Sequence, residues 1–342
     1  MTHVHEAQLY TKNPDGTADC RLCNHRCRIA GGRTGRCGVR RNREGVLWSA
    51  SYGRVSAEHV DPIEKKPLNH FLPGTLCYSL GSVGCNFTCE HCQNWQLSRA
   101  ADAVESLPLL EPGEAVDRAV ASGCASISWT YNEPTMSFEY SLDTGRIAHG
   151  AGLGTVWVTN GYMTEEAVDA LAPVLDAFRV DLKAFDDGFY RTVCGAHLDP
   201  VLAATRRAHE AGMHVETVTL VIPGLNDAPA EIDALIRWVI EELGPDTPMH
   251  FTRFHPDYRM RDRAPTPVRT LERIYERALE LGLRFPYLGN VGGHRNENTW
   301  CPACGNLLIE RSMLQGRLRG LDGSSCRQCG EAIPVVRSVR PR

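Results

Sequence analysis

The feature of this sequence that most limits its fold is an alternation of two patterns between residues 76 and 291. A short apolar run rich in β-branched residues is followed by turn residues and an amphipathic stretch of helical period, and the unit then repeats. This alternation predicts a parallel sheet with right-handed crossovers, either open and doubly wound or curved into an α/β barrel. Strands are expected at 76–84, 125–134, 154–162, 177–185, 214–224, 249–256 and 285–293, and helices at 112–123, 137–152, 164–175, 199–212 and 228–244.

Polar side chains capable of chemistry follow nearly every predicted strand. A barrel whose active site is built on the carboxyl rim of its strands has this layout. No G-x-G-x-x-G follows any predicted strand, so a dinucleotide-binding sheet loses its main support. The sequence therefore favours a partial or full (β/α) barrel of the TIM type. The rim residues are Cys85, Asn132, Glu133, Thr159, Asn160, Asp181, Lys183 and His255.

The segments on either side of this barrel differ from it in composition. We expect a metal-binding extension rich in cysteine and arginine at residues 1–70, the barrel at 71–292 and a small C-terminal module at 293–342. The first residues resemble no secretory signal, and no apolar run is long enough to span a membrane. The sequence thus predicts a cytoplasmic protein without a membrane partner, and its net charge of −4 gives no general attraction for nucleic acid.

Fourteen cysteines are many for a cytoplasmic protein, and most of them fall into three groups. The N-terminal quartet is C-x2-C-x3-C-x9-C, the central triad is C-x3-C-x2-C, and the C-terminal quartet is a pair of C-x-x-C motifs. Cys77, Cys124 and Cys194 stand apart and are expected to be core or pocket-wall thiols. In a chain without a secretory signal, C-x-x-C pairs indicate metal ligation rather than a disulfide framework.

The C-terminal quartet predicts a zinc ribbon. Gly305 and Gly330 follow the two C-x-x-C pairs, where the backbone has to turn over the metal. In so short a module, bound zinc would contribute much of the folding free energy. A single rubredoxin-like iron takes the same ligand set, so it remains an alternative to zinc. The ligands are Cys301, Cys304, Cys326 and Cys329.

The N-terminal quartet consists of Cys20, Cys23, Cys27 and Cys37, and its spacing is less specific. It suits either zinc or an auxiliary [4Fe–4S] cluster. The arginines around it would either bind a phosphate-bearing partner, RNA included, or form a solvated basic face. Because no aromatic residues alternate with them, the solvated face is favoured.

The central triad, Cys85, Cys89 and Cys92, supplies only three thiolates. A structural zinc site and a fully cysteine-ligated iron–sulfur cubane both need four, so three thiolates leave one metal position open. A loop after the first barrel strand is where such an open iron would meet a substrate or cofactor. The alternative is a zinc site completed by His91 or by a distant residue.

A C-x3-C-x2-C motif in this position resembles the signature of the radical S-adenosylmethionine (SAM) superfamily. The resemblance implies a [4Fe–4S] cluster held by the three cysteines, with SAM bound to the fourth iron. It also implies reductive cleavage of SAM to methionine and a 5′-deoxyadenosyl radical that abstracts a hydrogen atom. A strongly reducing donor such as flavodoxin or ferredoxin would supply the electron.

The same resemblance implies roles for the rim residues. Glu133 and the backbone near Asn132 would receive the ammonium group of SAM, although Tyr131 and Asn132 stand where the superfamily carries two glycines. His91 stands where the superfamily has an aromatic residue on the adenine, and it is either a stacking ring or an extra ligand. The SAM carboxylate, ribose and adenine would be lined by Thr159, Asn160, Asp181, Lys183 and His255.

Over nearly the whole chain, the motifs are similar to those of the radical SAM enzymes of the AmmeMemoRadiSam system, which are related to pyruvate formate-lyase activating enzymes. Further motifs that carry this likeness are VDPIEKKPLNHFLPG, VIPGLND and CPACGNLLIE. The resemblance implies an activating enzyme that takes hydrogen from a partner protein, or an enzyme that acts directly on a small molecule or an RNA nucleotide. The flanking modules favour a macromolecular partner, protein rather than RNA. A non-catalytic zinc-binding interaction protein is the alternative from another class.

Overall fold

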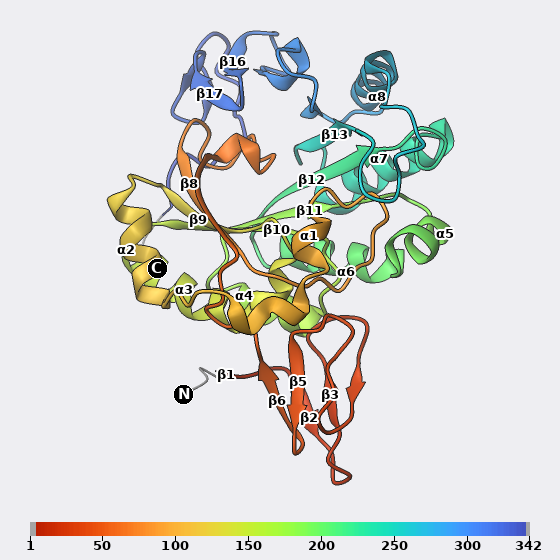
Figure 1. Cartoon of the computed structure of the whole chain (residues 1–342). Coiled ribbons are helices and arrows are strands. Elements are labelled where there is room, and N and C mark those ends of the chain that lie inside the picture. Colours follow the sequence, from red (N-terminus) through yellow and green to blue (C-terminus); the bar gives the residue numbers. More distant parts are fainter. Residues whose placement is uncertain (1–4, 340–342) are drawn as a thin grey trace.

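The computed structural model of the chain describes residues 5–339 (Figure 1). Residues 1–4 and 340–342, at the outer ends of the two predicted flanking modules, lie outside the described residues. The largest element is an eight-stranded sheet in the order β14-β13-β12-β11-β10-β9-β8-β7. Its strands are β7 (Ala57–Pro62), β8 (Leu76–Gly81), β9 (Ser126–Trp129), β10 (Gly154–Thr159), β11 (Ala177–Asp181), β12 (His214–Val221), β13 (Met249–Arg253) and β14 (Pro286–Gly289).

This sheet confirms the expected α/β architecture, and the barrel that it forms is partial. Strands β8 to β14 run parallel to their neighbours, whereas β7 pairs with β8 in the antiparallel sense. Within the described residues β7 and β14 are the two edges, so the sheet does not close on itself. Because β7 lies before residue 71, the sheet begins inside the range expected for the N-terminal extension. The domain boundaries themselves remain a prediction.

The helices between the strands pack against the sheet and against one another (Figure 1). The five expected helices are present, and α8 lies where the alternation requires a sixth, between β13 and β14.

In the part of the chain that the structure describes, no helix is both long and apolar enough to cross a bilayer. The longer helices are α2 (Pro112–Ala121), α3 (Phe138–Gly150), α4 (Glu165–Leu171), α6 (Leu198–Glu210), α7 (Pro229–Leu243) and α8 (Val268–Glu280), and the shorter ones are α1 (Trp95–Ser98), α5 (Asp187–Phe189), the 3-10 turns Ile63–Lys65, Ala101–Ser106, Pro134–Ser137 and Arg295–Glu297, and the π-helical turn Tyr190–Cys194.

Local sequence explains where these helices begin and which face they bury. Proline occupies the first turn of α2 and α7, where a missing backbone N–H costs nothing. The Thr164 hydroxyl caps α4 by accepting the Ala167 N–H at 3.2 Å. In α8 the buried residues Leu271, Ile274 and Ala278 recur at helical spacing. This pattern was available to sequence reasoning, although α8 was not among the helices expected.

The N-terminal extension contains two small antiparallel sheets and lies at the carboxyl rim of the main sheet. One sheet has the order β1-β6-β5 and the other β2-β3-β4. The extension contacts the segment after β10. Cys23 and Met163 form an isolated antiparallel β-bridge through their backbones, and the Asn24 side chain donates to the Met163 carbonyl at 2.7 Å. Strands of two to four residues are too short to show an alternating pattern in sequence. They are β1 (His5–Glu6), β2 (Tyr10–Lys12), β3 (Ala18–Cys20), β4 (Arg28–Ile29), β5 (Arg40–Arg43) and β6 (Val46–Ser49).

The C-terminal module lies at the opposite end, against the amino ends of the strands. Val336 exchanges backbone hydrogen bonds with Leu72 and His70, and Phe285 and Tyr287 around the start of β14 share a hydrophobic core with the module. Figure 1 shows this module (blue) and the N-terminal extension (red) on opposite sides of the sheet. Its strands are β15 (Thr299–Trp300), β16 (Leu307–Ser312), β17 (Gln315–Leu318), β18 (Leu321–Asp322) and β19 (Ser325–Cys326).

A buried carboxylate on β12 organises this amino-terminal end. Glu216 accepts the backbone N–H groups of Asn69 and His70 at 2.9 and 2.7 Å. The Nε2 atoms of His214 and His250 lie 3.0 and 2.7 Å from its two oxygens. Burial alone would raise the pKa of Glu216, but the hydrogen bonds from the two histidines hold it well below its usual range. The segment before β8 is thereby fixed to the middle of the sheet.

Acid should loosen this end of the molecule. Burial lowers the pKa of His70 to about 3, whereas an unfolded histidine titrates at about 6.5. The stability that comes from neutral His70 is therefore complete above pH 6.5 and is lost as the pH falls towards the folded pKa. The depressed pKa of Glu216 acts in the same direction at lower pH, since its contribution is present above about 4.3 and declines below that value.

We expect the free energy of unfolding to fall by about 2 kcal/mol between pH 7.5 and pH 5 through His70 alone. A His70→Gln variant should be less stable at pH 7.5 but should show a fall smaller by that amount. Urea denaturation at the two pH values measures both quantities. His209→Gln, at an exposed position on α6, is the control and should follow the wild type. Equal falls in wild type and His70→Gln would show that this histidine does not carry the effect.

Candidate active site and metal centres

The central triad lies in the loop that follows β8 at the carboxyl rim. Cys89 is buried, and Cys85 and Cys92 are half-buried. The backbone N–H of Phe87 donates to the Cys85 sulfur at 3.3 Å, and the Cys92 sulfur lies 3.5 Å from the Ser98 hydroxyl of α1. Donors placed on sulfur in this way favour the thiolate form, which is the form that binds metal.

The segment after β9 holds this loop in place. The Asn132 side chain accepts the Ser82 N–H at 2.9 Å and donates to the Gly84 carbonyl at 3.0 Å, directly before the first cysteine. Tyr131 has a φ of +71°, a left-handed conformation in which glycine is the usual residue. Its hydroxyl donates to Asp61 at 2.6 Å. Side-chain contacts therefore maintain a backbone shape that glycine adopts without strain.

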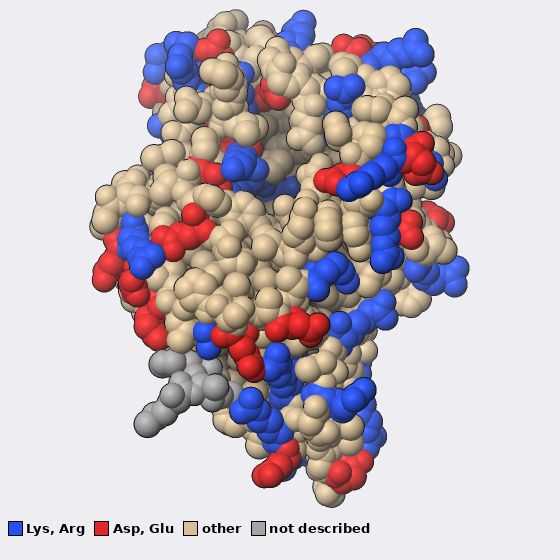
Figure 2. Space-filling model, viewed as in Figure 1, with Lys and Arg blue, Asp and Glu red and all other residues tan. Residues whose placement is uncertain are grey.

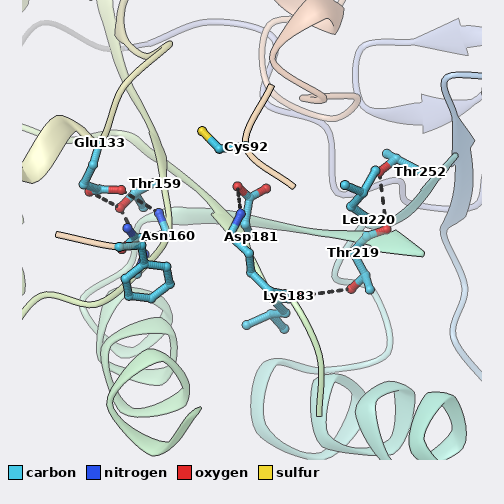
Figure 3. A network of polar contacts seen from close by, with 12 residues as sticks. Cys92, Glu133, Thr159, Asn160, Asp181, Lys183, Thr219, Leu220 and Thr252 are labelled. Carbon is cyan, nitrogen blue, oxygen red and sulfur yellow. Dashed lines mark hydrogen bonds and ion pairs between the residues drawn. The ribbon is translucent and has the colours of Figure 1, made fainter. Parts of the chain in front are cut away.

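Glu133 is buried at the rim and surrounded by donors (Figure 3). Its Oε1 accepts the Thr135 N–H at 3.1 Å and the hydroxyls of Thr135 and Thr159 at 2.6 Å each, and its Oε2 accepts the Asn160 N–H at 2.8 Å. Burial raises the pKa of Glu133, and these hydrogen bonds oppose the shift. The structure thus brings together three residues that the sequence placed after two different strands.

Asn160 connects this carboxylate to the central triad. Its Nδ2 donates to Asn86 Oδ1 at 2.8 Å and lies 3.8 Å from the Cys85 sulfur. Asn86, which sequence reasoning did not single out, is buried, and its own Nδ2 has no hydrogen-bond partner among residues 5–339. Buried amide groups are normally paired. An unpaired amide beside the triad is a group that a bound cofactor would satisfy.

Asp181 and Lys183 leave the end of β11 and form an ion pair at 2.8 Å, near the Cys92 sulfur in Figure 3. Arg179 pairs with the other oxygen of Asp181, a contact that the sequence did not predict. Burial alone would raise the pKa of Asp181, but Arg179 and Lys183 lower it to about 2. Burial alone would lower the pKa of Lys183, but the Asp181 charge raises it. All three side chains are therefore charged at neutral pH.

His91 is buried beside Phe189, with ring centroids 6.1 Å apart and an interplanar angle of 39°. Neither of its ring nitrogens has a hydrogen-bond partner in the described part of the chain. Burial, followed by the charge of Lys183, lowers the pKa of His91 to about 3, so its ring is neutral at pH 7. A neutral ring with unpaired nitrogens suits both roles that the sequence left open, stacking and ligation.

His255 differs from the other predicted rim residues because it is exposed. Its Nδ1 lies 2.9 Å from the Pro256 carbonyl. Three residues further on, Tyr258 stacks on Trp95 of α1, with centroids 5.1 Å apart and an interplanar angle of 13°. The segment after β13 therefore contacts the helix that follows the triad, while contact between His255 and SAM stays a prediction.

Cys194, which the sequence set apart from the three groups, lies beside the central triad. It is fully buried, and its side chain raises the pKa of the Cys89 thiol. Cys194 is the last residue of the π-helical turn. Two carbonyls of this turn accept hydrogen bonds from the triad loop, Cys194 O from the Thr88 N–H at 2.8 Å and Val193 O from the Glu90 N–H at 3.2 Å. Such turns are frequent at functional sites. A single distant cysteine carries no sequence signal for this contact, so only the structure reveals it.

The triad does not share the close sulfur spacing of the C-terminal quartet. Its sulfurs are not among the sets of three or more ligand atoms that lie within 4.8 Å of one another in the described residues. Burial raises the pKa of Cys85 and Cys92, so bare thiolates are unfavourable there. Metal binding would offset that cost.

The C-terminal quartet has the geometry of a site for one metal ion. Its four sulfurs lie within 4.8 Å of one another. The Cys301 and Cys329 sulfurs are 3.6 Å apart, and those of Cys304 and Cys326 are 3.7 Å apart. Ligands at about 2.3 Å from one tetrahedral ion are about 3.8 Å from each other. Gly305 and Gly330 have left-handed backbones with φ of +72° and +81°, in accord with the turn expected after each pair.

The N-terminal quartet lines one cavity beside the carboxyl rim. Cys20 and Cys23 are buried, Cys27 and Cys37 are half-buried, and Arg40 lies against them. Burial is the main cause that raises the pKa of Cys20, Cys23 and Cys37. The structure therefore gathers the four cysteines that the sequence grouped.

The comparisons with known proteins agree with this geometry. Residues 80–239 match the model of the Radical SAM superfamily. An uncharacterized protein of Methanocaldococcus jannaschii is 44% identical over 337 residues, which cover 97% of this chain and all of that protein. The benzylsuccinate synthase activating enzyme of Thauera aromatica is 32% identical over 90 residues, which cover 26% of this chain and 27% of that enzyme.

Among solved structures, a radical SAM methyltransferase from Sphaerobacter thermophilus has a TM-score of 0.49 and 18% identity, with 66% of this chain and 70% of that chain covered. The matched superfamily model spans the segment from β8 into α7, which contains the central triad, Glu133, Asp181 and Lys183. The chain belongs to the radical SAM superfamily.

Proposed function

We propose that Cys85, Cys89 and Cys92 hold a [4Fe–4S] cluster and that SAM binds its fourth iron. Membership of the superfamily implies both cofactors. The observation that supports this ligand set is the position of the triad: three thiols on one rim loop, with the unpaired amide of Asn86 and the unpaired ring of His91 beside them. When bound and reduced by one electron, the cluster supports cleavage of a SAM C–S bond to methionine and a 5′-deoxyadenosyl radical, which becomes 5′-deoxyadenosine by taking a substrate hydrogen atom.

The residues of this chain would orient the cofactor and keep charges in place. The Glu133 carboxylate is fixed by four hydrogen bonds, which suits a partner for the SAM ammonium group. Lys183 would meet the SAM carboxylate, while Asp181 keeps the Lys183 ammonium charged. Asn132 and Asn160 position the loop by holding Gly84 and Asn86. These roles follow from charge complementarity and from rigid hydrogen-bonded geometry.

We further propose that the substrate is a partner protein, so that the chain acts as an activating enzyme. The partial similarity to the benzylsuccinate synthase activating enzyme favours this class. Figure 2 shows one face hollowed between the C-terminal module and the sheet, with basic side chains inside the hollow. RNA is less favoured, because several arginines of the N-terminal extension are paired with acids, as Arg28 is with Asp15 and Arg41 with Glu105. A flavodoxin or ferredoxin would deliver the electron.

Anaerobic protein with a reconstituted cluster tests the proposal. With dithionite and SAM, we expect methionine and 5′-deoxyadenosine in equal amounts. With a partner protein, we expect turnover to rise and a radical to appear on that protein in electron paramagnetic resonance (EPR) spectra. Stimulation by a small metabolite or an RNA without a partner protein would replace the activating-enzyme proposal by one of the alternatives. Absence of both a [4Fe–4S] signal and 5′-deoxyadenosine would overturn the radical SAM assignment of the triad.

We propose zinc for the C-terminal quartet, because its sulfur spacing matches a single tetrahedral ion and the module lies at the amino end of the sheet, away from the triad. In TIM-type barrels that end contributes stability rather than catalysis. Zinc quantitation after exposure to a chelator, together with thermal unfolding, tests this role. Loss of the metal should lower the unfolding temperature without removing iron from the triad.

The side chain of Cys194 lies beside that of Cys89 and raises the pKa of its thiol. With Cys89 bound to iron as a thiolate, we expect the Cys194 S–H to donate to the Cys89 sulfur and to tune the cluster. Hydrogen bonds to a ligand sulfur stabilise the reduced, more negative cluster. Removing one worth about 1 kcal/mol should lower the midpoint potential by about 40 mV in Cys194→Ala. An EPR-monitored redox titration measures the shift. Cys194→Ser, which keeps a donor, should restore most of it, and Cys124→Ala should leave the potential unchanged. A purely structural role for Cys194 would show no such rescue.

A further inference from the structure

We propose that the N-terminal quartet, Cys20, Cys23, Cys27 and Cys37, holds a second [4Fe–4S] cluster rather than a zinc ion. This inference rests on the proposed function in one respect. It uses the central triad, to which the first cluster is assigned, as the reference for the spacing of cluster ligands. The evidence consists of sulfur spacing, the groups that line the cavity, and its place beside the catalytic rim.

The distance between ligand sulfurs distinguishes a single zinc ion from a [4Fe–4S] cluster. Thiolates on a single zinc ion are about 3.8 Å apart, whereas thiolates on four different irons of a cubane are about 6 Å apart. Among the described residues, the cysteines with three or more sulfurs within 4.8 Å of one another are those of the C-terminal quartet. The N-terminal quartet does not meet that limit, although all four residues line one cavity.

The same chain provides references for both geometries. The central triad, which the superfamily motif assigns to a [4Fe–4S] cluster, also exceeds the 4.8 Å limit. The C-terminal quartet, which has the knuckle sequence of a zinc ribbon, falls within it. Like the central triad, and unlike the C-terminal quartet, the N-terminal quartet has no three sulfurs within 4.8 Å of one another in the described chain, and this likeness is what favours a cluster over a single zinc ion.

The lining of the cavity provides a compensating charge and an unused donor. Arg40 is fully buried, and its Nη atoms bind Glu139 at 2.7 and 2.9 Å. Its Nε has no hydrogen-bond partner within residues 5–339. Since Arg40 lies against Cys20 and Cys37, this N–H is available to a thiolate or a cluster sulfide.

The cavity adjoins the loop of the central triad. A Cβ on Gly84, the residue before Cys85, would lie 2.8 Å from the Cys37 carbonyl. His25, within the quartet segment, has its Nε2 2.7 Å from the Asn86 carbonyl. Arg36 donates to the Gly195 carbonyl at 3.1 Å, next to the π-helical turn. A cluster in this cavity would thus lie beside the triad loop, unlike a metal ion in the C-terminal module at the other end of the sheet.

Metal quantitation in three variants tests the proposal. The proteins are reconstituted anaerobically with iron and sulfide in the full chain, and iron, sulfide and zinc are measured per chain. Wild type should contain about eight irons, and the triad variant Cys85→Ser/Cys89→Ser/Cys92→Ser should retain about four. The quartet variant Cys20→Ser/Cys23→Ser should likewise retain about four. Cys124→Ser, at a cysteine outside all three groups, is the control and should match the wild type.

Reduced samples supply a second readout. Two reduced clusters on adjoining loops should broaden each other's EPR signals, and each variant should show one sharper signal. A triad variant with no iron and with two zinc ions would overturn the proposal, even if the quartet variant fails to fold. A triad variant that keeps all the iron of the wild type would instead overturn the assignment of the triad and leave the quartet's cluster in place.

Discussion

Replacing Cys89 by alanine should remove the iron of the central triad and reduce 5′-deoxyadenosine formation to the level of a sample without enzyme. Cys89 is the middle cysteine of the triad, is proposed to ligate the cluster and is 8% exposed. The variant keeps only two thiolates, so the cluster loses one iron–thiolate bond, and hydrogen bonds to sulfur cannot replace that bond. Iron quantitation and chromatographic assay of 5′-deoxyadenosine measure the two losses on the same sample.

The neighbouring thiol makes a further variant necessary. Because the side chain of Cys194 lies beside that of Cys89, its sulfur is a candidate for a replacement ligand. The double variant Cys89→Ala/Cys194→Ala should therefore lose any iron that Cys89→Ala still retains. Zinc in the C-terminal quartet should be unchanged in both, and Cys124→Ala should behave as wild type. SAM cleavage at the wild-type rate in the double variant would show that the cluster lies elsewhere.

The strands and the rim residues could be predicted from sequence for the same physical reason. Strands of a parallel sheet are buried on both faces, so β10 reads as a short, largely apolar run, and both serines of β9 are buried between its apolar residues. Their carboxyl ends meet at one edge, so polar residues after them converge. Glu133, which follows β9, accepts a hydrogen bond at 2.6 Å from the hydroxyl of Thr159, the last residue of β10. The position of each residue relative to its strand was sufficient for this inference.

Contacts between distant segments could not be predicted in this way. A π-helical turn places Cys194 beside the triad. Arg179 and Asp181 are two residues apart on β11, so their side chains lie on the same face of the strand and form an ion pair. The N-terminal extension is built from strands of two to four residues, which carry too little pattern to be recognised. Its location on the carboxyl rim depends on single contacts, such as that of Asn24 with Met163. Sequence grouped its four cysteines but could not give their spacing, which is what distinguishes the two metals.

Among changes that leave the metal-binding cysteines in place, breaking the ion pair that joins this extension to the barrel should be the most destabilising single one. Arg40 on β5 and Glu139 on α3 bind through two hydrogen bonds, with side chains 2% and 0% exposed. Glu139 also accepts the Gln8 N–H at 2.8 Å. Glu139→Ala would leave a buried guanidinium without its partner, and we expect a loss of about 3–5 kcal/mol in the free energy of unfolding. Urea denaturation under anaerobic conditions measures it.

The cost should come from the unpaired charge rather than from the lost contact itself. The double variant Arg40→Met/Glu139→Met replaces both charges by apolar side chains and should therefore be more stable than Glu139→Ala. The matched control is Asp233→Ala, which breaks a two-hydrogen-bond pair with Arg277 at the surface and should change stability little. Hydrogen exchange should rise first in β5 and β6 of Glu139→Ala, because that pair fixes their sheet to α3. If the double variant is as unstable as Glu139→Ala, geometry rather than buried charge holds the extension to the rim.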